Sequence, residues 1–212
     1  MQIERSELWI VTRFAEAQEV LSWAVVGGGR RRATTVANRY VRRADLPEHV
    51  DPEGKLVAWM AEAGLQDAVG MMTATRLDGL QDVTRTVDGV TARALVTAGL
   101  GNRLRAGDPP TMAVTGTINT LVHVDQPLSE AALVEALGLV VEAKTVAVLE
   151  AGLRSAVSDG VASGTGTDCV VVACPPGGRE PYAGKHTAIG AAVGAAVLEA
   201  TRAAVARWMA LH

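Results

Sequence analysis

The sequence has few of the features that mark exported, membrane-spanning or disulfide-bonded proteins. It has only two cysteines, Cys169 and Cys174, five positions apart in an expected strand, where they should point to opposite faces. We therefore expect no disulfide framework and a cytoplasmic protein in a reducing compartment. No charged and then apolar leader opens the chain, and we find no apolar run of the roughly 20 residues that span a bilayer.

The chain also has no large excess of positive or negative charge. The 20 basic and 23 acidic residues leave a net charge of −3, without a basic stripe, so we expect neither a nucleic-acid nor a membrane partner. None of the histidines has a partner four residues away, and no paired Cys-x-x-Cys occurs. We therefore expect no metal site and no resident cofactor.

Lysine is scarce, whereas arginine is plentiful. Lys55, Lys144 and Lys185 are the lysines of the chain. Arginine evidently serves for ordinary surface charge, but it cannot replace lysine where a compact or deprotonating ammonium is needed. The lysines are therefore candidates for special roles, although chance explains so small a number equally well.

The 212 residues, 49% of them hydrophobic, suit a single domain over 1–212 with a sizeable core. Expected strands cover 8–14, 21–26, 34–41, 68–75, 115–124 and 168–173, with a hairpin of 82–87 and 90–98 around Asp88-Gly89. Residues 27–32 read as a loop. Helices are expected over 52–63, about 23 residues from the cap Ser129, and 185–209. This order predicts an α+β or mixed α/β fold, with mixed or antiparallel sheets under long helices, as two layers or an α-β-β-α sandwich.

The expected helix after Ser129 separates two charged residues. At about 100° per residue, Glu142 falls on the least apolar stripe, whereas Lys144 lies nearly opposite among aliphatic side chains. An unpaired buried ammonium is costly. Lys144 therefore extends its head to water, pairs with a buried carboxylate, or reaches into an active site. We expect it to face inward, toward Asp168 or a substrate.

The segment Gly164-Thr165-Gly166-Thr167-Asp168 directly precedes an apolar strand. Its small residues would expose backbone N–H groups that bind an anion or oxyanion, and the two Thr hydroxyls could donate or attack. Asp168 could accept a proton, orient a water or hold Lys144. A tight turn with Asp168 as its local acceptor explains the same residues without any chemistry.

Lys185 and His186 are expected to open the last helix, where the helix dipole would add to an electropositive spot. His186 could act as a general acid or base, or simply be a surface histidine. Gly190 and Gly194 lie four apart on this helix, and their small-residue face would allow close packing or a homodimer.

The chain resembles the adenosylcobinamide amidohydrolases of corrinoid salvage from about Leu21 to Ala204. The resemblance is carried by the order and spacing of short motifs, which are Leu21-Ser22, Gly28-Gly29, Asn38, Met71-Met72-Thr73-Ala74, Thr97-Ala98-Gly99-Leu100-Gly101-Asn102, Gly116-Thr117-Ile118-Asn119, Leu128-Ser129-Glu130-Ala131-Ala132-Leu133, Glu142-Ala143-Lys144-Thr145, Gly164-Thr165-Gly166-Thr167-Asp168 and Tyr182-Ala183-Gly184-Lys185-His186-Thr187. It implies hydrolysis of adenosylcobinamide to adenosylcobyric acid and 1-amino-2-propanol, with the cobalt corrinoid as substrate rather than cofactor.

The residues themselves suggest roles for that reaction. Water or the hydroxyl of Thr165 or Thr167 would be the nucleophile, with Asp168 as base or orienter. The backbone of Gly164 to Thr167, with Asn102 or Asn119, would stabilise the oxyanion. Lys144 or His186 would protonate the departing amine, and Glu142 and Lys185 are candidates for substrate binding.

Two rival functions remain open on the sequence. A non-catalytic corrinoid-binding module would bind cobinamide without releasing aminopropanol. An N-terminal-nucleophile amidohydrolase for another amide would cleave itself before Thr117, Thr165 or Thr167.

Overall fold

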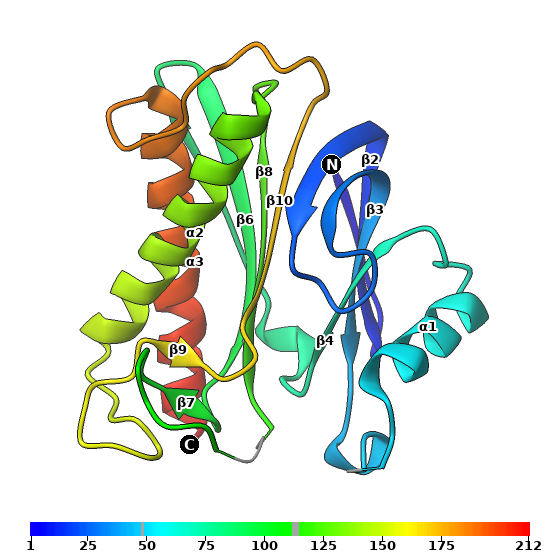
Figure 1. Cartoon of the computed structure of the whole chain (residues 1–212), viewed down its shortest axis with the longest axis vertical. Helices are drawn as coiled ribbons and strands as arrows, with labels where there is room; N and C mark the ends of the chain where they lie inside the picture. The colour runs from blue at the N-terminus through cyan, green and yellow to red at the C-terminus, as the bar shows by residue number, and fades with distance from the viewer. Residues whose placement is uncertain (48, 112–114) are drawn as a thin grey trace.

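The computed structural model describes residues 1–47, 49–111 and 115–212 (Figure 1). The helices are α1 (Pro52–Glu62), α2 (Glu130–Glu150) and α3 (Ala188–Leu211), with short 3-10 segments η1 (Arg43–Asp45) and η2 (Leu77–Gly79). The strands are β1 (Gln2–Arg5), β2 (Trp9–Ser22), β3 (Gly29–Tyr40), β4 (Val69–Thr73), β5 (Gln81–Val87), β6 (Val90–Gly99), β7 (Arg103–Leu104), β8 (Thr117–Val124), β9 (Gly164–Thr165) and β10 (Cys169–Cys174).

One mixed sheet organises the molecule. Its 8 strands follow the order β4-β3-β2-β10-β8-β6-β5, with β1 beside β2, and β7 and β9 form a separate small sheet. The pairs β10–β8 and β3–β4 are parallel, whereas the other pairs of the large sheet are antiparallel. The predicted mixed α/β fold is confirmed.

The sheet bends back on itself, so that its two halves form two layers, with a layer of helices outside each half. One hydrophobic cluster lies between α2, α3 and the half formed by β10, β8 and β6; a second fills the space between the two halves of the sheet; a third lies between β2, β3 and α1. Figure 1 shows α2 and α3 on one side of the strands and α1 on the other. This is the α-β-β-α arrangement, built from one continuous sheet.

The bend follows from an irregularity in β2. The pairing of β2 with β3 shifts register between Arg13 and Gln18. Such bulges bend a strand and increase its twist. Residues 19–22 of β2 pair with β10, whereas residues 10–13 pair with β1. One strand thus joins the two layers, and the sequence prediction of two strands, 8–14 and 21–26, is wrong there.

The loop predicted over 27–32 is wrong for its second part, because Gly29 to Arg32 begin β3. Glu19 of β2 bonds Arg32 at 2.7 Å and Arg30 at 3.5 Å across the hairpin. Because Glu19 on the neighbouring strand pairs with these arginines, the run of arginines can form an exposed strand instead of a loop.

Other local signals are confirmed. Asp51 caps α1 by accepting from Glu53 N and Gly54 N, and Ser129 caps α2 by accepting from Ala132 N. The turn between β5 and β6 has positive φ at Asp88 (47°) and Gly89 (82°), as a two-residue hairpin loop requires.

The last helix begins three residues later than predicted. Thr187 caps α3 by accepting from Gly190 N at 2.9 Å, so the helix starts at Ala188. Lys185 and His186 therefore lie in the preceding turn and not in the first helical turn. Thr187 adopts extended backbone angles, and its side chain rather than that of Lys185 satisfies the free helical N–H groups.

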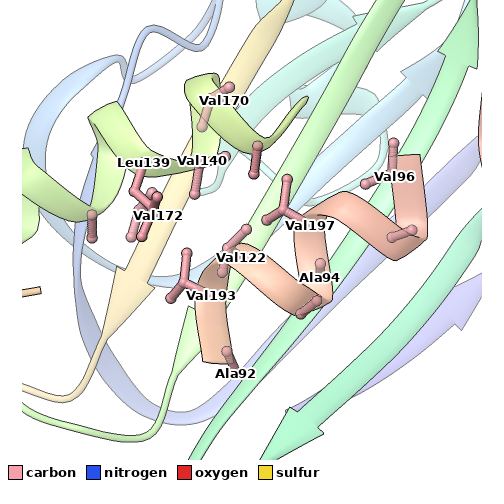
Figure 2. Packing of buried hydrophobic residues seen from close by; sticks show 14 of the residues in the cluster. Ala92, Ala94, Val96, Val122, Leu139, Val140, Val170, Val172, Val193 and Val197 are labelled. Carbon is pink, nitrogen blue, oxygen red and sulfur yellow. The ribbon is translucent and has the colours of Figure 1, made fainter. Parts of the chain in front are cut away.

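The core packs α2 and α3 against the sheet. Figure 2 shows Val140 of α2 and Val193 and Val197 of α3 meeting Val122 and Val172 of the strands. Among the described residues, α3 is the one helix long and apolar enough to cross a bilayer, contrary to the sequence expectation that no such segment exists. More than half of that apolar stretch, 56%, is buried inside the protein, so its composition serves the core.

Candidate active site

A buried ion pair lies where α2 packs over the beginning of β10. Lys144 is 6% exposed and its ammonium contacts Asp168 Oδ2. The prediction that Lys144 points inward toward Asp168 is confirmed. Because an unpaired ammonium would be costly here, Asp168 is what allows a lysine on this face of α2.

The other oxygen of Asp168 holds the turn that precedes β10. Asp168 Oδ1 accepts from Thr165 Oγ1 at 2.5 Å, from Thr165 N at 3.1 Å and from Ile118 N at 3.1 Å. Three donors thus share Oδ1, whereas the Lys144 ammonium is the donor on Oδ2. Among the described residues, Thr165 Oγ1 is the hydroxyl that hydrogen-bonds this carboxylate and from which it can accept a proton.

The segment 116–118 clamps this turn from one side. Thr117 Oγ1 donates to Thr167 O at 2.8 Å, and Thr167 Oγ1 donates to Gly116 O at 2.7 Å. Trp23 closes the other side, because its Nε1 donates to Asp168 O at 2.6 Å. The turn is thus held on both sides of the half-buried Thr165.

Sequence reasoning missed Trp23. The indole is 44% exposed beside the turn, although its N–H is bonded to it. Its partner is 145 residues away in the chain, so no local pattern could have paired them. The sequence feature that could have pointed to Trp23 is its position directly after the motif Leu21-Ser22.

Both glycines of the turn allow close approach. A Cβ at Gly164 would lie 2.7 Å from Lys144 Nζ and would collide with Asp168. A Cβ at Gly166 would lie 3.2 Å from Leu104 and 3.6 Å from Asn102 Nδ2. Gly164 is therefore required by the ion pair. The N–H of Gly166 makes only a long bond of 3.3 Å, to Asn102 O, and is the donor of the turn most easily redirected.

Asn102 and Asn119, both predicted near an oxyanion, have different surroundings. Asn119 is buried between the two sheet layers, where Nδ2 donates to Asn38 Oδ1 at 2.9 Å and to Met72 O at 2.7 Å. Both its N–H groups are engaged, so a direct role of Asn119 toward an oxyanion conflicts with its placement. Asn102 is 7% exposed, and its Oδ1 has no partner among the described residues.

The remaining predicted residues are not brought to this turn. Lys185 Nζ bonds Glu142 Oε1 at 2.6 Å, and both side chains are exposed. His186 lies next to Lys185 and is also exposed. Since Lys144 occupies the inner face of α2, this group lies on the other side of the helix. Within the described residues, none of the three contacts Asp168, Lys144 or Thr165.

The cysteines and His123 are not reactive groups at neutral pH. Burial and the nearby charge of Asp168 raise the pKa of Cys169 to about 12, and burial raises that of Cys174. Burial lowers the pKa of His123 to about 4. Cys169 and Cys174 belong to different clusters on opposite faces of β10, as predicted, and both are free. In the part of the chain that the structure describes, no three metal-binding side chains gather.

A hollow of about 480 Å³ opens beside the clamped turn. Gly116, whose carbonyl accepts from Thr167 Oγ1, forms part of its wall. The lining comes from the loops after β4, β6 and before β8 and from the end of α3, and comprises Ala74, Thr75, Arg76, Asp78, Gly79, Ala98, Gly99, Gly101, Thr115, Gly116, Ala204, Arg207, Trp208, Leu211 and His212. Ala74, Ala98, Gly99, Gly101 and Gly116 belong to motifs that carry the family resemblance, and they line this hollow rather than the turn itself.

Comparison with known proteins gives a consistent result. The sequence profile of the adenosylcobinamide amidohydrolases matches residues 1–212. An adenosylcobinamide amidohydrolase of Methanosarcina mazei is 31% identical over 189 residues, which cover 84% of this chain and 86% of that protein. One of Halobacterium salinarum is 40% identical over 95 residues, 44% of this chain and 37% of that protein. The chain belongs to the adenosylcobinamide amidohydrolase family.

Proposed function

We propose that this protein hydrolyses the amide that joins aminopropanol to the corrinoid in adenosylcobinamide, giving adenosylcobyric acid and 1-amino-2-propanol. Family membership supports the reaction. The observation that carries the site is the array in which Thr165 Oγ1 bonds Asp168 Oδ1 and Lys144 bonds Asp168 Oδ2. A nucleophile, a base and a group that orients the base are the parts that acyl transfer needs.

Thr165 is the proposed nucleophile. Its hydroxyl is already hydrogen-bonded to Asp168 at 2.5 Å, whereas Thr167 donates to the carbonyl of Gly116 and has no base in reach. Oγ1 would attack the amide carbon as its proton passes to Asp168. Lys144 is a positioning residue here, because its ammonium is buried behind Gly164 and touches the carboxylate rather than the open side.

Asn102 and Gly166 are the proposed oxyanion donors. The amide of Asn102 lies against Gly166, whose own N–H makes the long bond of 3.3 Å. When the intermediate collapses, the C–N bond breaks and Asp168 returns its proton to the departing amine nitrogen. Water then hydrolyses the ester on Thr165 with Asp168 as base, releasing the cobyric acid carboxylate and restoring the hydroxyl.

The proposed reaction also has consequences for cofactor, compartment and oligomeric state. The steps above use side chains of this protein, with cobalt carried in by the substrate and no resident cofactor. We further propose a cytoplasmic protein without nucleic-acid or membrane partners, in which the buried free thiols stay reduced. Gly190 packs against the backbone of Gly184, so a homodimer through the small-residue face of α3 would use the open space beside Gly194.

The test is incubation with adenosylcobinamide, followed by chromatography for cobyric acid and aminopropanol. Wild-type protein should release both. Thr165→Ala should lose at least about 1,000-fold in kcat and Asp168→Asn a similar amount, whereas Thr165→Ser should retain measurable turnover. Near-wild-type turnover by Thr165→Ala would contradict the nucleophile, and no cobyric acid from the wild type would contradict the reaction.

Two further readouts separate the mechanism from its rivals. Mass spectrometry of quenched reactions should find the cobyric acyl group on Thr165, which a water nucleophile would never produce. A denaturing gel should show one intact chain, because an N-terminal nucleophile would leave two fragments.

A further inference from the structure

We propose that the 480 Å³ hollow beside Gly116 receives the adenosyl group of the substrate, with the purine against Trp208 and the ribose diol on Asp78. This inference rests on the proposed function, because it assigns one part of that substrate to one part of the surface. It adds a nucleoside subsite to the turn that carries Thr165.

The size and position of the hollow suit the upper ligand of the substrate better than the whole corrinoid. Small-molecule sites range from about 300 to 1,000 Å³, so the hollow suits a nucleoside and is small for a complete corrinoid. Its wall includes Gly116, whose carbonyl is bonded to Thr167 two residues from Thr165. A corrinoid with its upper ligand in the hollow would therefore lie with the macrocycle across the mouth, beside the reacting turn.

The aromatic side of the hollow is formed by the end of α3. Trp208 stacks on His212 with ring centroids 4.5 Å apart and an angle of 13° between the planes. Trp208 is also packed against the core cluster under α3, and both rings line the hollow. A preset indole plane is the surface on which a purine stacks.

The polar side of the hollow is centred on Asp78. Its Oδ2 lies 3.6 Å from Arg76 and 3.6 Å from Arg207, and its side chain remains 56% exposed. The two cations lie at the same distance from the carboxylate, which makes no hydrogen bond to another described residue, so its oxygens are open to a ligand. A carboxylate accepts hydrogen bonds from two vicinal hydroxyls, the group that ribose offers.

Another part of the wall is backbone. Gly99, Gly101 and Gly116 line it, and a Cβ at Gly101 or Gly116 would lie 2.6 Å from Thr115 O or 2.7 Å from Asn102 Oδ1. These glycines are therefore required for the close packing of the loops after β6 and before β8, and this part of the hollow offers peptide groups rather than side chains.

The decisive experiment compares two substrates that differ in the upper ligand. The ratio of kcat/KM for adenosylcobinamide over methylcobinamide should fall about 10- to 100-fold in Trp208→Ala, and also fall in Asp78→Asn. Trp59→Ala on α1 is the matched control and should keep the wild-type ratio. The ratio is independent of how much of each variant is folded. An unchanged ratio in Trp208→Ala would overturn the subsite.

A binding measurement separates this proposal from the reaction itself. 5′-Deoxyadenosine should bind the wild-type protein in saturation-transfer NMR, and Trp208→Ala should lose the signal. If cobinamide is not hydrolysed, this measurement decides the subsite alone: binding that depends on Trp208 supports it, and no binding overturns it. If cobinamide is hydrolysed, the substrate ratio decides.

Discussion

Two lysine–carboxylate pairs lie on opposite sides of α2. Lys144 and Glu142 are two residues apart in the chain, yet Lys144 turns inward to Asp168 and Glu142 turns outward to Lys185. The inner side chains are 8% and 11% exposed, and the outer ones 67% and 53%. Both pairs join a lysine ammonium to a carboxylate, so they differ mainly in how far their side chains are exposed to water.

That difference changes what each pair contributes. Exposed pairs typically stabilise a protein by about 0–1 kcal/mol, because water already solvates both charges. Removing one partner of a buried pair costs about 3–5 kcal/mol, because the other charge stays buried without compensation. The inner pair is thus a feature that the fold must maintain, and it is also the one that holds Thr165.

The largest expected effect on stability is that of Lys144→Met. It should lower the free energy of unfolding by about 3–5 kcal/mol and, by releasing Asp168, slow turnover about 100-fold. Denaturant unfolding and adenosylcobinamide turnover at a permissive temperature measure the two effects. Lys144→Met combined with Asp168→Asn should be clearly more stable than the sum of the single changes predicts. Additive losses would show that the inner pair is no more coupled than a surface pair.

The second largest effect is expected from the protonation of His123 at acid pH, which also lowers the stability of the folded protein. His123 contacts Gln18 and Phe14, and burial lowers its pKa to about 4 in the folded protein, against about 6.5 when unfolded. The unfolded chain therefore binds the extra proton first, and about 3 kcal/mol of stability is lost as the pH falls from about 6.5 to about 4.

Denaturant unfolding at a series of pH values checks this loss. His123→Gln should flatten the decline between pH 6.5 and 4, since the substituted side chain does not titrate. If the variant declines as steeply as the wild type, His123 is not the cause. The two ion pairs should accordingly be compared above pH 7.

Gly164→Ala should have the next largest effect. The new methyl group would occupy the space 2.7 Å from Lys144 Nζ and force the inner pair apart. Overpacking of this kind costs about 1–3 kcal/mol. Gly138→Ala on α2, where a Cβ meets nothing within 4 Å, is the matched control and should be neutral or stabilising. A Gly164→Ala protein as stable and active as the wild type would contradict the close packing around the pair.

The smallest effect is expected from the outer pair. Lys185→Met or Glu142→Gln should change the free energy of unfolding by no more than about 1 kcal/mol, and the change should shrink in about 1 M salt. Turnover of adenosylcobinamide should stay near the wild-type value. A loss of more than about 10-fold in kcat/KM would show that the substrate reaches the outer side of α2, as the residue types alone suggested.

Much of the local structure was predictable from short-range patterns. The cap Ser129, the start of α1 at Pro52 and the turn Asp88-Gly89 depend on contacts within four residues, and the sequence alone identified them. The inward side of Lys144 followed from helical periodicity. The continuity of β2 did not, because its polar middle residues resemble a turn and become a strand only when β3 and β10 supply partners.

The candidate site divides in the same way. The resemblance carried by the short motifs indicated the family, helical periodicity placed Lys144 on the inner side of α2, and the glycine-rich segment marked the turn that contains Thr165 and Asp168. The bond from Thr165 to Asp168 spans three residues, and the sequence offered it as a tight turn. Only the tertiary structure decided that Ile118 and Trp23 bond Asp168 and that Asn119 is enclosed between the sheet layers. These hydrogen bonds join segments about 50 to 145 residues apart, and no local pattern records which distant donor reaches which acceptor.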